Sequence, residues 1–121
     1  MTIIRNDRGK EFGGFTKAHW DSNSGYKNDN EAFLFSLTSN QKFLHNKKGA
    51  AIYCGSGYGP CFGNGHEIGF SGYFDKNDGG YSQVTGSSYF DVPGGAEVLV
   101  GCQNRVGFRC VEIEVYSIVF R

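Results

Sequence analysis

The residues with the clearest chemical potential lie in one glycine-rich stretch, "YGPCFGNGHEIGF", Tyr58 to Phe70. It places a cysteine, Cys61, shortly before a histidine, His66. A thiol beside an imidazole can act as a nucleophile, because the imidazole removes the proton of the thiol. That pairing would require a sharp fold-back of the loop and a third group to orient His66. The glycines of the stretch are also typical of tight turns and closely packed backbone, and this structural interpretation is the one we favour.

The other thiols give no sharper signal. The chain has four cysteines, and no pair has the C-x-x-C spacing of a redox or zinc site. We expect reduced thiols that behave mostly as small buried hydrophobic side chains. The two candidates for a redox-active thiol are Cys61 and Cys110. Arg109 precedes Cys110, but neighbours on a strand point to opposite faces, which weakens that pairing.

Sites for phosphate and metal ions are not indicated. The glycine runs between residues 55 and 69 match neither the Walker loop nor the dinucleotide fingerprint. The segment Asp75–Gly80 resembles a calcium loop, but Gly86 stands where that loop needs a bidentate glutamate. Each of the three histidines lies in a different segment. We therefore expect no metal, no cofactor and no catalytic residue, and we predict that the protein is not an enzyme.

Two glutamates lie near the end of the sequence, in the segment "CVEIEVYSIVF", Cys110 to Phe120. Apolar residues alternate there with Glu112, Glu114 and Tyr116. This period of two predicts a half-buried strand with both glutamates on the face opposite the valines. Glu112 and Glu114 are accordingly the candidate residues for binding a partner.

The elements that must position these residues are short strands separated by turn signals. No amphipathic helix and no domain boundary is evident, so we predict a single, mainly β domain over residues 1–121. Its fold class is a two-layer antiparallel β-sandwich with few or no helices. Polar loops are expected at Asp21–Asn30 and Ser39–Lys48. The expected strands are Thr2–Arg5, Phe12–Trp20, Glu31–Thr38, Ala50–Cys54, His66–Phe70, Glu97–Cys102 and Cys110–Phe120.

Composition excludes some classes of function. The 121 residues carry 12 Lys and Arg against 12 Asp and Glu, so a nonspecific nucleic-acid-binding protein, which needs a basic surplus, is not expected. No apolar run approaches the roughly 18 residues of a membrane-spanning helix. The start of the chain is polar after Ile4, unlike a signal peptide. We expect a cytoplasmic protein.

Several motifs in order resemble one family. They are "FGGFTKAHW", "DNEAFLFSL", "GPCFGNGHEI" and "EIEVY", which follow one another through nearly the whole chain. This series is similar to the TLDc domain, whose fold is a β-sandwich with a few short helices. The resemblance implies that Gly13 and Gly14 allow a strand to kink, and that the loop of Tyr58–Phe70 is a turn leading into a strand. The residues it marks as structural are Gly13, Gly14, Phe15, Trp20, Phe33, Phe35, Gly59, Pro60, Phe62, Gly63 and Gly65, with the aromatic ones expected in the core.

The resemblance also implies a function. TLDc domains are linked to protection against oxidative stress, and several bind the cytosolic sector of the V-type ATPase. A non-catalytic protein-interaction domain is therefore expected here. Family domains carry a stretch before "TIIR", so we interpret the domain as N-terminally shortened, with self-association or a partner covering the exposed sandwich surface. The alternatives are a redox thiol protein acting through Cys61 or Cys110, and a ligand- or sugar-binding β-sandwich that uses the loop of Asp21–Asn30.

Overall fold

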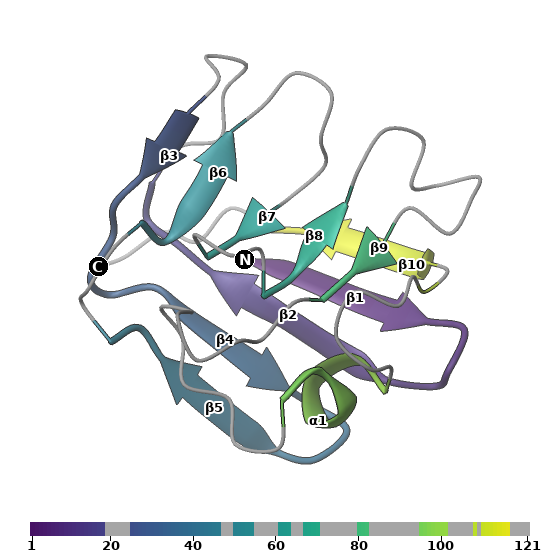
Figure 1. The fold of residues 1–121 in the computed structure, drawn as a ribbon. Coiled ribbons are helices and arrows are strands. Elements are labelled where there is room, and N and C mark those ends of the chain that lie inside the picture. The colour runs from purple at the N-terminus through teal and green to yellow at the C-terminus, as the bar shows by residue number, and fades with distance from the viewer. Residues whose placement is uncertain are drawn as a thin grey trace.

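The fold is built from short antiparallel strands, as seen in a computed structural model (Figure 1). The structure describes residues 1–18, 25–46, 50–54, 61–63, 67–70, 80–82, 95–101, 108 and 110–116. Within this part, strands form a five-stranded sheet of order β10-β1-β2-β4-β5, a three-stranded sheet β3-β6-β7 and a two-stranded sheet β8-β9. The elements are β1 (Thr2–Asn6), β2 (Glu11–Phe15), β3 (Gly25–Lys27), β4 (Phe33–Ser36), β5 (Gln41–Leu44), β6 (Ile52–Cys54), β7 (Cys61–Phe62), β8 (Gly69–Phe70), β9 (Gly80–Tyr81), α1 (Ala96–Val100) and β10 (Cys110–Val115).

Alternation of side chains gives the five-stranded sheet one face that packs on the core. On β1, Ile4 is fully buried while the next residue, Arg5, is exposed. Ile4 lies opposite Phe12 of β2, and Leu34 of β4 lies opposite Phe43 of β5. These four side chains are all buried and belong to one hydrophobic cluster. The predicted mainly β fold is therefore confirmed, and the residues that share the face of Ile4 and Phe12 form the core side of the sheet.

The core lies between this sheet and the smaller ones, as expected for a sandwich (Figure 1). Phe62 of β7 is fully buried, and its ring lies against Gly14 of the large sheet. Phe108 makes edge-to-face contacts with Phe12 on one side and with Phe70 of β8 on the other. Aromatic rings thus lie at the contacts between all three sheets.

The segment predicted as a strand over Glu97–Cys102 is instead a short helix, α1, so that prediction is wrong. Gly101 adopts a left-handed conformation (φ 79°), and its N–H donates to the carbonyl of Glu97, which ends the helix. Leu99 and Val100 are fully buried, and α1 packs against β2 and β4. A short apolar run bounded by glycines is compatible with a strand or with a helix. Here the glycine cap favours the helix. Among the described residues, no helix has the length and apolar character needed to cross a membrane.

Two segments predicted as polar loops contain strands. Residues Gln41–Leu44 form β5, which pairs with β4 through a tight connection where Asn40 has a positive φ of 55°. Of the four residues of β5 only Phe43 is buried, and the strand lies inside a largely polar stretch of sequence, which hides it from sequence inspection. Similarly, Gly25–Lys27 form β3, where the half-exposed ring of Tyr26 packs on that of Tyr53 in β6.

Gly13 and Gly14 are required because other atoms come very close to them. A Cβ on Gly13 would lie 1.9 Å from the carbonyl oxygen of Thr2, and one on Gly14 would lie 2.6 Å from the ring of Phe62. Some of the described residues have a positive φ, but Gly13 and Gly14 are not among them. Their role is therefore close packing of strands and rings, where the resemblance implied a kink.

The aromatic residues expected in the core divide between two faces. Phe62 lies in the core cluster, whereas Phe15, Phe33 and Phe35 lie on the opposite face of the large sheet, where Phe15 and Phe35 are also buried. There the rings of Phe15 and Phe33 stack with centroids 5.2 Å apart, and Lys42 sits 4.2 Å above the centre of the Phe33 ring. Trp20 lies outside the described residues.

Candidate functional site

Strand β10 lies at the edge of the large sheet and carries both predicted partner-binding glutamates. Its pairing with β1 places Ile113 opposite the buried Ile4 and Glu112 opposite the exposed Arg5. Glu112 and Glu114 therefore lie on the same, outward face, in agreement with the alternation in the sequence. This geometry presents two carboxylates side by side at the margin of a sheet.

The prediction that β10 is half-buried holds only at its centre. Ile113 packs against the core, but Val111 is 56% exposed and Val115 is 63% exposed. The pairing with β1 is irregular between Arg5 and Asn6, next to Val111. At the other end, Val115 lies opposite the buried Thr2, on the same face as Ile113, yet its side chain is mostly exposed.

A charged row crosses three strands on this face. Arg5 of β1 lies opposite Glu112 of β10 on one side and opposite Glu11 of β2 on the other. A guanidinium nitrogen of Arg5 and a carboxylate oxygen of Glu112 are 2.9 Å apart, and both side chains are half exposed. An exposed pair of this kind contributes little stability, up to about 1 kcal/mol, so it acts mainly by fixing the positions of the charges.

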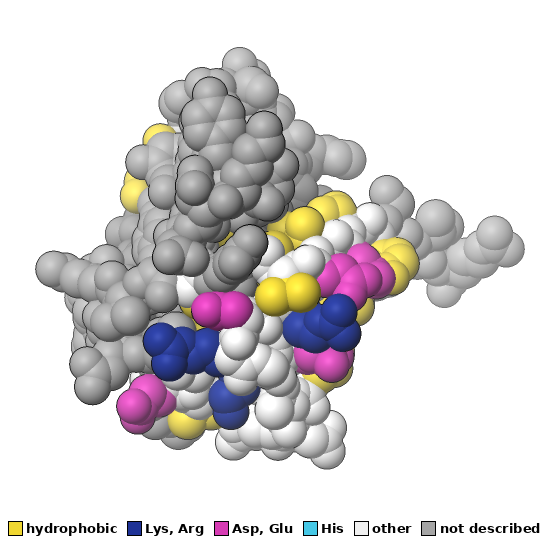
Figure 2. Space-filling view, turned by 90° about the vertical axis from the view of Figure 1, so that its right-hand side faces the viewer, with side chains coloured by type: hydrophobic (Ala, Val, Ile, Leu, Met, Phe, Trp, Pro, Cys, Tyr) yellow, Lys and Arg dark blue, Asp and Glu magenta, His cyan; other side chains and the backbone are white. Residues whose placement is uncertain are grey.

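A groove of about 240 Å³ follows this row and opens to solvent. It is bordered by three carboxylates, one guanidinium and two apolar side chains, so its walls carry excess negative charge. On the face shown in Figure 2, acidic and basic side chains lie next to hydrophobic ones. The lining residues are Ile3, Arg5, Glu11, Leu37, Glu112 and Glu114.

Tyr116 extends the acidic edge beyond β10. Its hydroxyl donates a hydrogen bond to the carboxylate of Glu114, and this bond raises the pKa of the Tyr116 hydroxyl above its usual value. The backbone N–H of Tyr116 donates to the carbonyl of Met1 (2.7 Å), and the amino group of Met1 donates to the carbonyl of Tyr116 (2.8 Å). The β1–β10 ladder thus continues one residue past the strand and holds the Tyr116 ring next to Glu114.

The glycine-rich loop is built as packed backbone in its described part. Gly63 has a positive φ of 88°, and a Cβ there would lie 1.4 Å from a carboxylate oxygen of the fully buried Glu67. The hydroxyl of Ser82 donates to the backbone carbonyl of Glu67, which ties the loop to the segment after β9. Of the other predicted residues in this loop, Gly59, Pro60, Gly65 and His66 lie outside the described part of the chain.

The two candidate thiols are in different environments. Cys61 is fully buried, its thiol donates to the carbonyl of Phe70 at 3.8 Å, and burial raises its pKa to about 11. A thiol with that pKa is almost entirely protonated at neutral pH, which disfavours a reactive nucleophile. Cys110 is partly buried at the start of β10, opposite Asn6. Within the described residues, no group of three or more His, Cys, Asp or Glu side chains is arranged to hold a metal ion.

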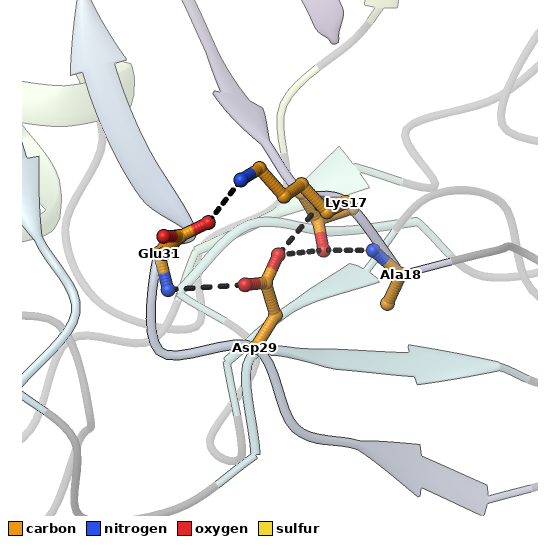
Figure 3. A network of polar contacts seen from close by, with 5 residues as sticks. Lys17, Ala18, Asp29 and Glu31 are labelled. Carbon is orange, nitrogen blue, oxygen red and sulfur yellow. Dashed lines mark hydrogen bonds and ion pairs between the residues drawn. The ribbon is translucent and has the colours of Figure 1, made fainter. Parts of the chain in front are cut away.

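A second polar cluster, around Asp29, braces two loops (Figure 3). The carboxylate of Asp29 accepts hydrogen bonds from the Thr16 hydroxyl (2.8 Å), the Lys17 N–H (2.6 Å) and the Glu31 N–H (3.0 Å). Lys17 and Glu31 also form an ion pair. Because the carboxylate accepts three hydrogen bonds from the protein, we interpret this cluster as a structural brace that positions the ends of β2 and β4.

Sequence inspection found Glu112 and Glu114 but missed the residues that complete the groove. Arg5 and Glu11 lie on the consecutive strands β1 and β2 and Leu37 follows β4, and the strand register brings all three beside β10. The exposed Leu37 reaches the groove because the backbone N–H of Leu37 donates to the carbonyl of Glu11. The segment Thr2–Asn6 gives no signal for the groove beyond its single charged residue, Arg5.

The fold and this surface define an antiparallel β-sheet protein with an exposed acidic edge strand. The chain belongs to the TLDc domain family, whose family model matches residues 1–119. Searches among curated proteins and among solved structures gave no match.

Proposed function

We propose that this chain is a non-catalytic protein-interaction domain, with its docking surface at strand β10 and the acidic groove beside it. The observation that carries the proposal is the exposed groove in which Glu112, Glu114 and Glu11 surround a single guanidinium, that of Arg5. Charged, solvent-exposed rims of this kind steer association and select partners more than they add affinity. The exposed Val111 and Val115 beside them supply apolar surface that a partner can bury.

Family membership suggests which partner to test first. The TLDc family is linked to oxidative-stress protection and to the cytosolic sector of the V-type ATPase, so we propose a cytoplasmic role in binding and regulating that sector. This part of the proposal depends on the resemblance, and the groove on β10 supports only the general class of protein binding.

The test is capture of purified V-type ATPase cytosolic sector by the immobilised chain. The wild type is compared with a Glu112→Lys/Glu114→Lys variant, which reverses the charge of the β10 edge. A Glu31→Lys/Glu97→Lys variant is the matched control, because it makes the same change of net charge at exposed residues that do not line the groove. Circular dichroism establishes that all three chains are folded.

The proposal expects the wild type and the control to capture the sector, and the β10 variant to lose most of the binding. Equal capture by all three folded chains would place the docking surface elsewhere on the molecule. No capture by any folded chain would remove the V-type ATPase as the partner of this domain.

A further inference from the structure

The outer edge of β10 offers backbone hydrogen-bonding groups as well as charge. Among the described strands, β10 pairs only with β1 and ends the sheet on that side (Figure 1). An unpaired edge is a template on which another extended chain can form hydrogen bonds. Proteins usually prevent such pairing with edge strands that are short or highly charged. β10 has this protection only in part, because it is six residues long and has an exposed valine near each end.

The hydrogen bonds to β1 determine which backbone groups point outward. Met1 and Tyr116 exchange both N–H to carbonyl bonds, so they form a hydrogen-bonded pair. In an antiparallel ladder such pairs alternate with non-hydrogen-bonded ones. Glu114 and Glu112 therefore turn their backbone groups toward β1, whereas Val115 and Ile113 turn theirs away from β1, toward the side on which no described strand pairs.

The same alternation specifies the side chains that a bound strand should carry. Residues opposite Glu112 and Glu114 would lie in non-hydrogen-bonded pairs, where cross-strand side chains are closest, so basic residues fit there. Residues opposite Ile113 and Val115 would lie over the inward face, where Val115 is 63% exposed, so apolar residues fit there. The edge thus matches a strand in which basic and apolar residues alternate.

A second copy of the chain is a poorer occupant on grounds of charge. If two β10 strands paired antiparallel with matching faces, glutamates of the two copies would lie opposite or next to one another. With Ile113 at the centre, for example, Glu112 of each copy faces Glu114 of the other. Like charges directly opposite each other on a sheet are destabilising.

We infer that β10 binds its partner protein by strand addition, and that the bound segment is extended, with Lys or Arg alternating with apolar residues. The inference rests on the proposed function, which it refines by naming the binding mode and the chemistry of the partner segment. Backbone pairing with Ile113 and Val115 provides affinity, and the Glu112 and Glu114 carboxylates select for basic side chains.

The test uses fluorescence anisotropy with a labelled short peptide that alternates Lys and Val, titrated with the full chain. Two peptides with N-methyl groups separate strand addition from simple charge attraction. Methylation of the Val nitrogens removes the N–H groups that would face β10, whereas methylation of the Lys nitrogens alters groups that would face away. A peptide of the same composition with all Lys residues at one end keeps the charge but breaks the alternation.

Strand addition predicts binding of the alternating peptide and of its Lys-methylated form, with at least tenfold weaker binding of the Val-methylated and segregated peptides. A Glu112→Gln/Glu114→Gln variant should bind the alternating peptide about tenfold more weakly, because two exposed charge pairs are lost. The matched Glu31→Gln/Glu97→Gln variant should bind like the wild type.

Other results would overturn the inference in distinguishable ways. Equal binding of both methylated peptides would mean that charge alone attracts the peptide, and no binding of any peptide would exclude an alternating basic strand as ligand. A concentration-dependent dimer that Val115→Pro abolishes, seen by light scattering, would identify a second copy as the occupant. If the peptides fail but the ATPase sector is still captured through β10, the proposed function stands without strand addition.

Discussion

At the scale of single residues, Gly13 is the position where packing leaves least room. A Cβ there would lie 1.9 Å from the Thr2 carbonyl oxygen, which is backbone and cannot rotate away. We expect Gly13→Ala to lower the free energy of unfolding by about 2–3 kcal/mol, as overpacking does. Gly9→Ala is the control, because Gly9 has open space around it and only a left-handed φ of 74° to lose, costing about 1 kcal/mol. Urea unfolding measures both, and equal costs would contradict the packing argument.

Asp29 should make the stability depend on pH in the acid range. Burial acts to raise the pKa of Asp29, but hydrogen bonds from the Lys17 N–H, the Thr16 hydroxyl and the Glu31 N–H outweigh it and lower the pKa. The folded pKa is thus below the unfolded one, so the stabilisation is complete above about pH 4 and is lost as the pH falls through the lower, folded value.

Asp29→Asn should therefore destabilise the protein at pH 7 by about 1 kcal/mol, a modest value because the carboxylate is only partly buried. The difference between wild type and variant should shrink as the pH falls from about 5 to about 2. Unfolding free energies measured across this range check the prediction. A difference that stays constant with pH would show that the lost bonds do not depend on the charge.

Cys61 provides a test of the redox alternative. Because burial raises its pKa to about 11, the thiol should react with iodoacetamide at neutral pH far more slowly than the same cysteine in the urea-unfolded chain. Mass spectrometry of alkylated peptides measures the rate for each thiol, with Cys110 as the internal comparison. Rapid alkylation of native Cys61 would contradict this prediction and would support the alternative of a redox-active thiol.

At the scale of elements, the end of α1 depends on the left-handed conformation of Gly101 (φ 79°). Gly101→Ala should lower the unfolding free energy by about 1–2 kcal/mol, because a Cβ disfavours this backbone region. Gly101→Asn should cost less, since asparagine tolerates the left-handed region better than alanine does. Thermal unfolding of the two variants compares them, and a larger loss for asparagine would indicate that contact with Lys10, and not φ, limits the position.

The elements also show where the sequence was informative. The strands predicted over Thr2–Arg5 and Cys110–Phe120 are present as Thr2–Asn6 and Cys110–Val115, and in the second the faces of Glu112, Ile113 and Glu114 were assigned correctly. β5 and α1 were not predicted, because β5 buries only one side chain and α1 is too short for its periodicity to appear. The glutamates of the candidate surface were evident from their spacing, but Arg5 and Glu11 join them only through strand register, which a single sequence does not encode visibly.

At the scale of the whole molecule, Phe108 holds the layers together. Its ring contacts Phe12 of the large sheet and Phe70 of the two-stranded sheet, with centroids 5.5 and 5.7 Å away. Phe108→Ala should cost about 3–5 kcal/mol, as for other buried aromatic residues, and should lower hydrogen-exchange protection in both sheets together. Phe33→Ala, on the partly exposed opposite face, is the comparison with a smaller cost. A loss of protection confined to β8 and β9 would mean that the layers unfold independently.

The pairing of β1 with β10 has a consequence for synthesis of the chain on the ribosome. β1 lies between β2, which follows it closely, and β10, whose extension pairs Met1 with a residue 115 positions later. At ordinary translation rates β10 is synthesised on the order of ten seconds after β2. During that interval one side of β1 has no native strand beside it, and that side is open to non-native strand pairing.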